Sequence, residues 1–365
     1  MNSFKDQYPQ LEIDLDKLKE NLAALIERCH DSLVEIVPVV KGANSLPEIA
    51  RVFEKCGVKY MATSRVDQLR TLKDAGIRTP LMLIRIPMLS ELESVVAYSE
   101  ASLQSDITVI RAIDEEAKRQ GKIHNVILMI DLGDLREGFW DAEELVRAAV
   151  EIEKERKGLH LLGVGVNLSC YGSVKPSKRN MQGLASLSAD VEQAIGRKLE
   201  YVSGGASTSV SMVLDGTMPY RVNMLRVGEF VLTGQIYGCC PDFTHKDAFT
   251  LRAEVVECRE KPSLPVGELT VDAFGRVREY VDRGIRRRAI VDIGRVDYGD
   301  CEDIKPRRKG VEVLGASSDH TLLDVHDVEG ELKVGDILEF DVNYASTVYL
   351  TGSRSVHVTF KSKEA

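Results

Sequence analysis

Long apolar runs are missing from this sequence of 365 residues, so no segment is long enough to cross a membrane. The first ten residues, MNSFKDQYPQ, also lack the apolar core of a signal segment. An excess of positive charge is absent as well, because 57 acidic residues against 48 basic residues give a net charge of −9. We therefore expect a protein that binds neither nucleic acid nor an anionic membrane.

Cysteine pairs at metal-binding spacing are absent too. The seven cysteines are scattered, their number is odd, and no CxxC pair occurs. This pattern indicates neither a disulfide framework nor a zinc site, and we expect no metal. A reducing, cytoplasmic setting is the expectation that follows.

Two parts of the chain have different patterns, as expected for a length above that of most single cores. Up to residue 234, short apolar runs alternate with amphipathic segments. The expected strands are 35–40, 59–63, 80–85, 101–105, 125–132, 160–167, 199–204 and 223–230, and the expected helices include 47–56, 141–156 and 177–195. Eight strand–helix repeats predict an α/β fold, a (β/α)8 barrel of the TIM type.

The part beyond residue 234 is predicted to form an all-β domain. Its expected strands are 250–260, 287–294, 310–317, 320–328, 336–342 and 355–360. We place the barrel at 12–234 and the C-terminal β domain at 235–365, with 1–11 as a segment that could join the β domain. An early strand at 11–16 could pair with the β domain instead of the barrel.

A lysine follows the first expected barrel strand, in the sequence EIVPVVKGAN. The carboxyl ends of barrel strands carry the chemistry of this fold. Lys41 is either a solvated surface lysine, which is the common case, or an amine that condenses with a carbonyl group. The second role requires partial desolvation or a neighbouring cation that lowers its pKa.

Polar residues also follow four later strands. Arg136, after the fifth strand, could bind a carboxylate or pair with a nearby acid, and Asn167, after the sixth, could orient a ring hydroxyl or belong to a turn. The sequences SGGASTS (203–209) and LRVGEF (225–230) lie at the seventh and eighth strands, where barrels commonly bind phosphate. An ordinary turn with a helix cap is the alternative there.

Taken in order, these features resemble the alanine racemase family of pyridoxal-phosphate enzymes (fold type III). They are a lysine after strand one, D-x-G-x-x-R-x-G after strand five, a glycine-rich serine stretch after strand seven and R-x-G at strand eight. The resemblance covers nearly the whole chain, and DLGDLREG, GASSDHTLLDV and VNYASTVYL are similar to the ornithine racemase branch. It implies a barrel followed by a β domain, the cofactor pyridoxal 5′-phosphate, and a racemase that removes and returns the α proton of an amino acid.

The resemblance also implies roles for single residues. Lys41 would bind the cofactor aldehyde and act as the base on one face of the substrate. Arg136 would contact the phenolic oxygen of the cofactor and the substrate carboxylate. Asn167 stays a candidate for the ring hydroxyl because of its position after the sixth strand.

The remaining cofactor contacts that the resemblance implies lie near the phosphate and the ring nitrogen. Ser207 with the backbone amides of Gly228 and Glu229 would hold the phosphate, and Tyr344 matches the family's tyrosine that reaches it. Arg226 would face the pyridine nitrogen. A cation there disfavours a protonated ring, which weakens the electron sink and suits a reaction that only moves the α proton.

This sequence departs from the family's motifs at two places, which concern the second acid–base group and a phosphate contact. Racemisation needs groups on both faces of the α carbon. The family's second base is a tyrosine in I-G-Y-A-D-G of the partner subunit, whereas this chain reads I-G-R-V-D-Y at 293–298, with Arg295 at that position. The open candidates are Tyr298, Asp297 and the group Ser318, Asp319 and His320. Ser45 stands where the family has a second phosphate tyrosine.

Acidic residues near the substrate would suit a basic amino acid such as ornithine. Asp319 and Asp297 are the candidates, with Ser318 beside the first, and a role at a dimer interface is the alternative for both. The resemblance implies a head-to-tail homodimer in which each β domain closes the partner's barrel. Other readings are a fold type III decarboxylase, a non-catalytic pyridoxal-phosphate-binding protein and an aldolase-type Schiff-base barrel.

Overall fold

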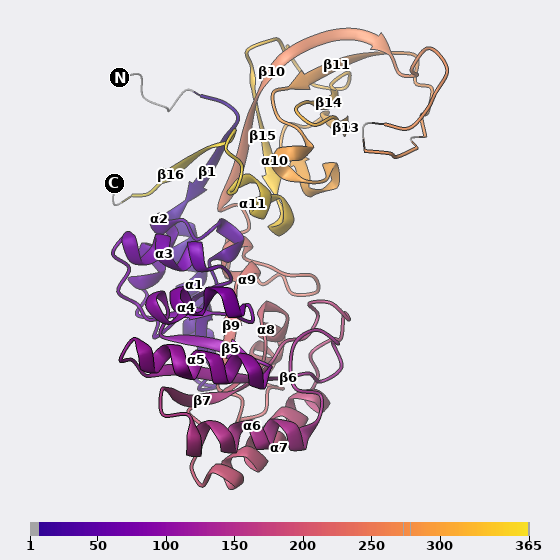
Figure 1. The fold of residues 1–365 in the computed structure, drawn as a ribbon. Coiled ribbons are helices and arrows are strands. Elements are labelled where there is room, and N and C mark those ends of the chain that lie inside the picture. The colour runs from indigo at the N-terminus through magenta and orange to yellow at the C-terminus, as the bar shows by residue number, and fades with distance from the viewer. Residues whose placement is uncertain (1–6, 273, 278, 364–365) are drawn as a thin grey trace. The chain divides into compact units, whose positions relative to one another are not determined.

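The computed structural model describes residues 7–272, 274–277 and 279–363 and divides the chain into two compact units (Figure 1). One unit runs from Lys17 to Lys246, and the other combines the chain up to Asp16 with the chain from Asp247 onwards. The expected boundary at 234 lies earlier than this division. The difference has a physical reason, because the segment before Lys246 is held on the barrel unit: Asn21 Nδ2 donates to His245 O at 2.9 Å and His245 N donates to Asn21 Oδ1 at 2.7 Å.

Eight parallel strands form the sheet of the first unit, in the order β2-β9-β8-β7-β6-β5-β4-β3. A parallel bridge between Val39 and Ala62 joins its two edges, so the predicted (β/α)8 barrel is confirmed. The strands are β2 (Glu35–Pro38), β3 (Met61–Thr63), β4 (Leu81–Leu83), β5 (Ala101–Gln104), β6 (His124–Ile130), β7 (Leu159–Val166), β8 (Tyr201–Ser203) and β9 (Met224–Val227).

Amphipathic helices surround this sheet, and short polar caps set where they begin. Asp106 caps α5 by accepting from Thr108 N at 2.7 Å, and Asp141 caps α6 by accepting from Glu144 N at 2.8 Å. The helices are α1 (Leu15–His30), α2 (Pro47–Glu54), α3 (Val66–Asp74), α4 (Leu92–Tyr98), α5 (Ile107–Arg119), α6 (Ala142–Glu155), α7 (Lys178–Ile195), α8 (Val210–Leu214) and α9 (Glu229–Thr233). The strands themselves are almost entirely buried, as expected for a parallel sheet covered on both faces.

The eighth barrel strand is shorter than the predicted 223–230. It ends at Val227, and the next residues form the short helix α9, which is closed by Gly234 at a left-handed φ of 70°. Glu229 therefore begins a helix and does not continue the predicted strand.

Among the described residues of the second unit, eight strands form one sheet: β12-β15-β10-β11-β14-β13 follow one another, β1 pairs with β10, and β16 pairs with β1. The predicted all-β domain is thus present. The early strand belongs to it, because β1 pairs with β10 antiparallel and with β16 parallel. The strands are β1 (Gln10–Asp14), β10 (Phe249–Pro262), β11 (Ile285–Val291), β12 (Ile304–Pro306), β13 (Glu312–Ala316), β14 (Thr321–Asp324), β15 (Ile337–Val342) and β16 (His357–Lys361).

Two short helices of this unit were not expected from the sequence. They are α10 (Arg295–Tyr298) and α11 (Tyr344–Leu350). Asn343 caps the second helix by accepting from Ser346 N at 3.0 Å. Both candidate tyrosines of this unit, Tyr298 and Tyr344, therefore lie on helical turns.

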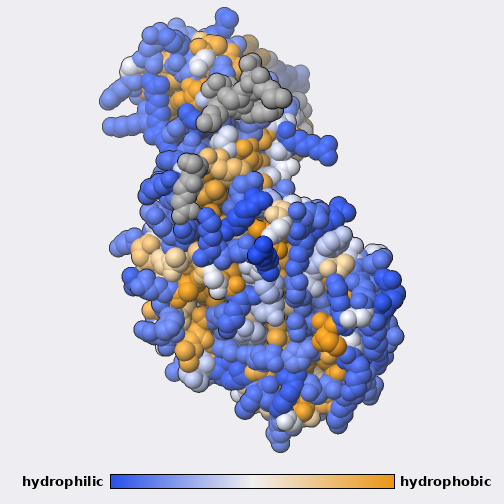
Figure 2. All heavy atoms as spheres, turned by 90° about the vertical axis from the view of Figure 1, so that its left-hand side faces the viewer, coloured by the Kyte–Doolittle hydropathy of each residue, from blue (hydrophilic) through white to orange (hydrophobic). Residues whose placement is uncertain are grey.

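The surface in Figure 2 is largely hydrophilic, with separate apolar patches. In the part of the chain that the structure describes, no helix is both long enough and apolar enough to span a bilayer.

Candidate active site

Lys41 lies at the carboxyl end of the first barrel strand, at the start of a 3-10 turn over residues 41–43. The backbone before it is held on both sides, because Val39 N donates to Val227 O at 2.8 Å and Val40 N donates to Ala62 O at 2.9 Å. The backbone of Lys41 is therefore fixed at the mouth of the barrel.

The surroundings of Lys41 favour its neutral amine. Its pKa lies below the usual 10.5, chiefly because the surrounding protein removes part of its hydration, although the side chain keeps contact with solvent. The positive charges of Arg136 and Arg226 lower the pKa further, whereas Cys170 and Glu137 act in the opposite direction. Lys41, Arg136 and Arg226 are thus brought together at one site, as predicted from the order of the motifs.

Arg226 is a buried cation with fixed contacts. It is 2% exposed, and its Nη2 donates to Val166 O at 2.9 Å and to Asn167 Oδ1 at 2.7 Å. Its Nη1 donates to Ser203 Oγ. Burial lowers the pKa of Arg226 to about 10, so the guanidinium keeps its charge at neutral pH.

Asn167 and Glu137 connect the two arginines. Asn167 Nδ2 donates to Glu137 Oε1, and the same oxygen accepts from Arg136 Nη2 at 2.8 Å. Burial is the largest single influence on Arg136 and lowers its pKa, but the hydrogen bond to Glu137 and the charges of Cys170, Glu137 and Asp134 together outweigh it, so the pKa is raised. The pairing of Arg136 with its neighbour, which was the alternative to carboxylate binding, is therefore present in this structure.

Ser207 and two backbone amides converge at the start of α9. Ser207 Oγ accepts from Gly228 N and from Phe230 N, each at 3.2 Å. The amide of Phe230, and not that of Glu229, joins Gly228 in contacting this hydroxyl. Glu229 begins the helix, and burial raises the pKa of its carboxyl group.

Ser45 is buried and has internal partners. Its hydroxyl shares a hydrogen bond of 2.7 Å with Thr63 Oγ1, which donates to Gln68 Oε1 at 2.6 Å. This serine stabilises the turn after Lys41, and its burial does not suit a contact with a phosphate.

Tyr298 lies in the core of the β unit and has no exposed surface. Its hydroxyl shares a hydrogen bond of 2.7 Å with Thr321 Oγ1, and Thr321 in turn donates to Ile293 O. Burial raises the pKa of Tyr298. This packing argues against the prediction that Tyr298 is the second base.

The neighbouring residues on α10 also have internal partners. Arg295, at the position of the family's tyrosine, donates from Nη2 to Asp300 Oδ2 at 2.9 Å and lies 4.4 Å from the ring centre of Phe274. Asp297 is 5% exposed and accepts from Ser353 Oγ at 2.6 Å. Asp297 therefore has a structural role in this unit.

Ser318 and Asp319 lie in the turn between β13 and β14. Asp319 is exposed and accepts from Ser318 Oγ at 2.6 Å. Tyr344 is half-buried at the first position of α11. These three residues belong to the β unit, and their meeting with a barrel site stays a prediction.

Three residues of the barrel mouth were not selected from the sequence. Glu137 was considered only as a partner of Arg136, although its place inside the D-x-G-x-x-R-x-G motif was a usable signal. Asp134 lies inside the same motif and was likewise considered only as a possible partner of Arg136. Cys170 gave no such signal, because its environment depends on a contact between segments far apart in the chain.

Comparisons with known proteins agree with this fold. Residues 13–235 match the model of the alanine racemase N-terminal domain. The chain is 40% identical to the ornithine racemase of Acetoanaerobium sticklandii (93% of this chain, 96% of the relative) and 37% identical to the lysine racemase of Thermotoga maritima (93% and 94%). The alanine racemase of Clostridium difficile 630 has a similar fold, with a TM-score of 0.77, 21% identity and coverage of 99% and 98%. The resemblance seen in the sequence is thereby confirmed, and the chain belongs to the alanine racemase family.

Proposed function

We propose that this protein is an amino-acid racemase that uses pyridoxal 5′-phosphate and acts on a basic amino acid such as ornithine. The observation that carries the proposal is the juxtaposition of Lys41, whose pKa is lowered, with the cations Arg136 and Arg226 at one barrel mouth. The relatives that cover 93% of this chain are an ornithine racemase and a lysine racemase, which supports the choice of reaction and of substrate class.

The residues at the barrel mouth fit the proposed cofactor. Ser207 lies beside the start of α9, where its hydroxyl accepts from the amides of Gly228 and Phe230. We keep the predicted phosphate contacts, which are the Ser207 hydroxyl and the amides of Gly228 and Glu229. The buried guanidinium of Arg226 suits an unprotonated ring nitrogen. Lys41 offers an amine that loses its proton more easily than an ordinary lysine.

When bound, the cofactor supplies an electrophilic centre that holds the substrate amine and withdraws electrons from its α carbon. The neutral amine of Lys41 would take the α proton on one face, and the ammonium group so formed would return a proton there. Arg136 binds the substrate carboxylate while Glu137 holds its guanidinium in place. The fixed charge of Arg226 keeps electron withdrawal weak, which favours proton exchange over loss of carbon dioxide.

The opposite face of the substrate requires a second proton carrier. We infer that a second subunit supplies this proton carrier, in a homodimer in which the turn between β13 and β14 of one subunit enters the barrel mouth of the other. The partner subunit's Asp319 would then face the substrate, and its negative charge would suit a distal ammonium group. The exposure of that aspartate is compatible with this role, whereas the burial of Tyr298 and Asp297 is not.

Exposed apolar side chains of the β unit support an interface with a second copy. Val266, Val277 and Val281 are 93%, 81% and 72% exposed in one segment between β10 and β11. Burial of such side chains against a partner is favourable.

The cytoplasmic setting stays a prediction, and the seven free cysteines agree with it.

The test is incubation of the purified protein, supplied with pyridoxal 5′-phosphate, with a panel of single L-amino acids in heavy water. We expect deuterium at the α carbon and formation of the D isomer, fastest for ornithine or lysine. Release of carbon dioxide would identify a decarboxylase instead. Cofactor binding without deuterium exchange on any amino acid would point to the non-catalytic alternative.

A further inference from the structure

Asp134 has no role in the proposed reaction, yet its buried carboxylate makes an unusual set of contacts. It is 1% exposed and accepts four backbone N–H bonds from one loop. Oδ1 accepts from Ser169 N at 3.0 Å and from Val174 N at 3.1 Å, and Oδ2 accepts from Cys170 N at 3.0 Å and from Tyr171 N at 2.9 Å. The carboxylate therefore replaces the solvent that these four amides would otherwise bind.

The backbone of the same loop also meets Asp134. Gly172 N donates to Asp134 O at 3.0 Å, and a Cβ on Gly172 would come within 2.6 Å of that oxygen. Ser169 and Ser173 take left-handed φ values of 61° and 56°, which cost conformational energy for residues other than glycine. The loop keeps this shape because the carboxylate holds it.

The two segments that Asp134 joins carry the candidate site. Asp134 lies two residues before Arg136, and the loop begins two residues after Asn167, the partner of Glu137 and Arg226. Within the loop, Cys170 lies near enough to Lys41 and Arg136 for their positive charges to act on the pKa of its thiol, which burial raises. A movement of the loop away from Asp134 would therefore change the surroundings of Lys41.

We propose that Asp134 is a positioning residue of this site: its carboxylate fastens residues 169–174 beside Lys41 and so keeps the amine partly shielded from water. The inference rests on the proposed function, because it explains how the lysine is held ready for the cofactor aldehyde. Asp134 itself contacts neither substrate nor cofactor in this scheme.

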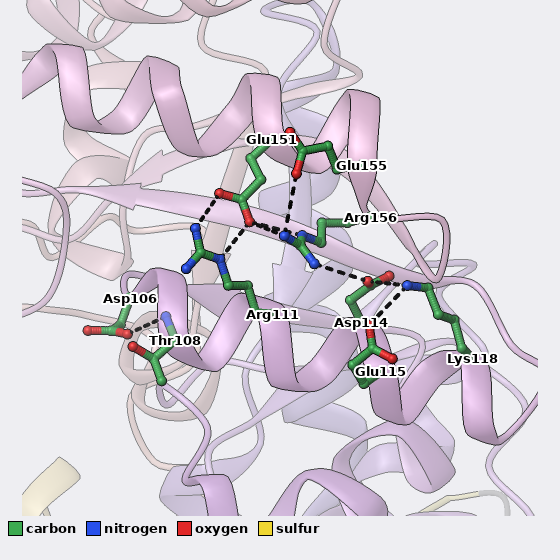
Figure 3. A network of polar contacts seen from close by, with 9 residues as sticks. All are labelled: Asp106, Thr108, Arg111, Asp114, Glu115, Lys118, Glu151, Glu155 and Arg156. Atoms are coloured by element: carbon green, nitrogen blue, oxygen red, sulfur yellow. Dashed lines mark hydrogen bonds and ion pairs between the residues drawn. The ribbon is translucent and has the colours of Figure 1, made fainter.

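A matched control is present at the opposite end of β7. Asp114 on α5 is also fully buried, and its Oδ1 accepts from Gly158 N at 2.7 Å just before that strand begins. Figure 3 shows it between Lys118 and Arg156, whose side chains pair with it. Replacing Asp114 with Asn therefore disturbs a buried carboxylate and a backbone contact of the same barrel without touching the barrel mouth.

The first readout is amide hydrogen exchange, resolved by mass spectrometry of peptides, in the full-length protein without added cofactor. In Asp134→Asn one oxygen becomes an NH2 group that faces two amide donors, so we expect exchange in 169–174 to accelerate at least about tenfold. Asp114→Asn should accelerate exchange near Gly158 and leave 169–174 unchanged. Gly172→Ala should push the loop away from Asp134, because the added Cβ would collide with the Asp134 carbonyl oxygen, and it should have the same effect as Asp134→Asn. It therefore keeps the test valid if the Asp134 variant folds poorly.

The second readout is the pH dependence of covalent attachment of pyridoxal 5′-phosphate, followed by absorbance. A freed loop rehydrates Lys41, which raises its pKa, and withdraws Cys170, whose smaller influence acts in the opposite direction. Because burial is the larger influence, we expect the midpoint for Asp134→Asn to move upward by about half a pH unit or more, and the midpoint for Asp114→Asn to stay in place. Unchanged exchange in 169–174, or faster exchange with an unmoved midpoint, would overturn the proposal. Wild-type protein that does not attach the cofactor would instead refute the proposed function, and the exchange data would still decide whether Asp134 holds the loop.

Discussion

At the scale of single residues, the chemistry of the barrel mouth depends on how charges are desolvated. Each unit of pKa corresponds to about 1.4 kcal/mol between the protonated and neutral forms of a group. Partial burial and two arginines lower the pKa of Lys41, and full burial lowers that of Arg226 without removing its charge. The site therefore combines one amine that deprotonates readily with one cation that persists.

Replacing Lys41 with Ala should remove covalent attachment of pyridoxal 5′-phosphate and lower racemisation by several orders of magnitude, because the base and the attachment point are lost together. The control is Lys59→Ala, which removes an exposed lysine that pairs with Glu35 and should leave both properties intact. Absorbance titration with the cofactor and a chiral assay measure the two effects. Attachment retained in the Lys41 variant would contradict the assignment.

Arg226→Lys should destabilise the protein by about 2–4 kcal/mol, because a single ammonium cannot satisfy Val166 O, Asn167 Oδ1 and Ser203 Oγ together in a buried site. Denaturant unfolding followed by circular dichroism measures this change. Arg111→Lys, at the exposed pair with Glu151 drawn in Figure 3, should have little effect. Equal stability of the two variants would show that the buried contacts contribute little.

At the scale of elements, the strand β1 explains why the early part of the chain belongs to the β unit. It lies between β10 and β16, so its apolar residues Leu11 and Ile13 are completely buried. The alternation of LEIDLD predicted a strand and left open whether it pairs with the β domain or the barrel, because pairing partners more than 200 residues away leave no local trace in the sequence.

Truncation of Leu11 to Ala should cost about 2–5 kcal/mol in the unfolding of the β unit, since the cavity forms in a well-packed sheet. Glu12→Ala changes the opposite, partly exposed face of the same strand and is expected to have a much smaller effect. Calorimetry of both variants is the measurement. A cost for Leu11 no larger than that for Glu12 would show that β1 adds little to the core.

At the scale of the whole molecule, the proposed dimer predicts complementation between inactive subunits. Each site would combine Lys41 of one subunit with the partner subunit's Asp319. Mixed dimers of Lys41→Ala and Asp319→Asn then contain one intact site and one doubly altered site, so random mixing should restore about a quarter of wild-type activity. The measurement is racemase activity after joint refolding. Activity no higher than that of the separate variants would exclude a shared site built on Asp319.

The sequence by itself determined the parallel barrel, the all-β part, and the presence of Lys41, Arg136, Ser207 and Arg226 at the barrel mouth. It could do so because apolar periodicity and the residues that follow each strand are local properties of the chain. Only the tertiary structure decided that Tyr298 is buried, that Asn167 and Glu137 connect the two arginines, and that Asp134 holds the loop at 169–174. Hydrogen bonds between residues 30 to 59 positions apart, and the burial that strengthens them, exist only once the strands have closed into a barrel.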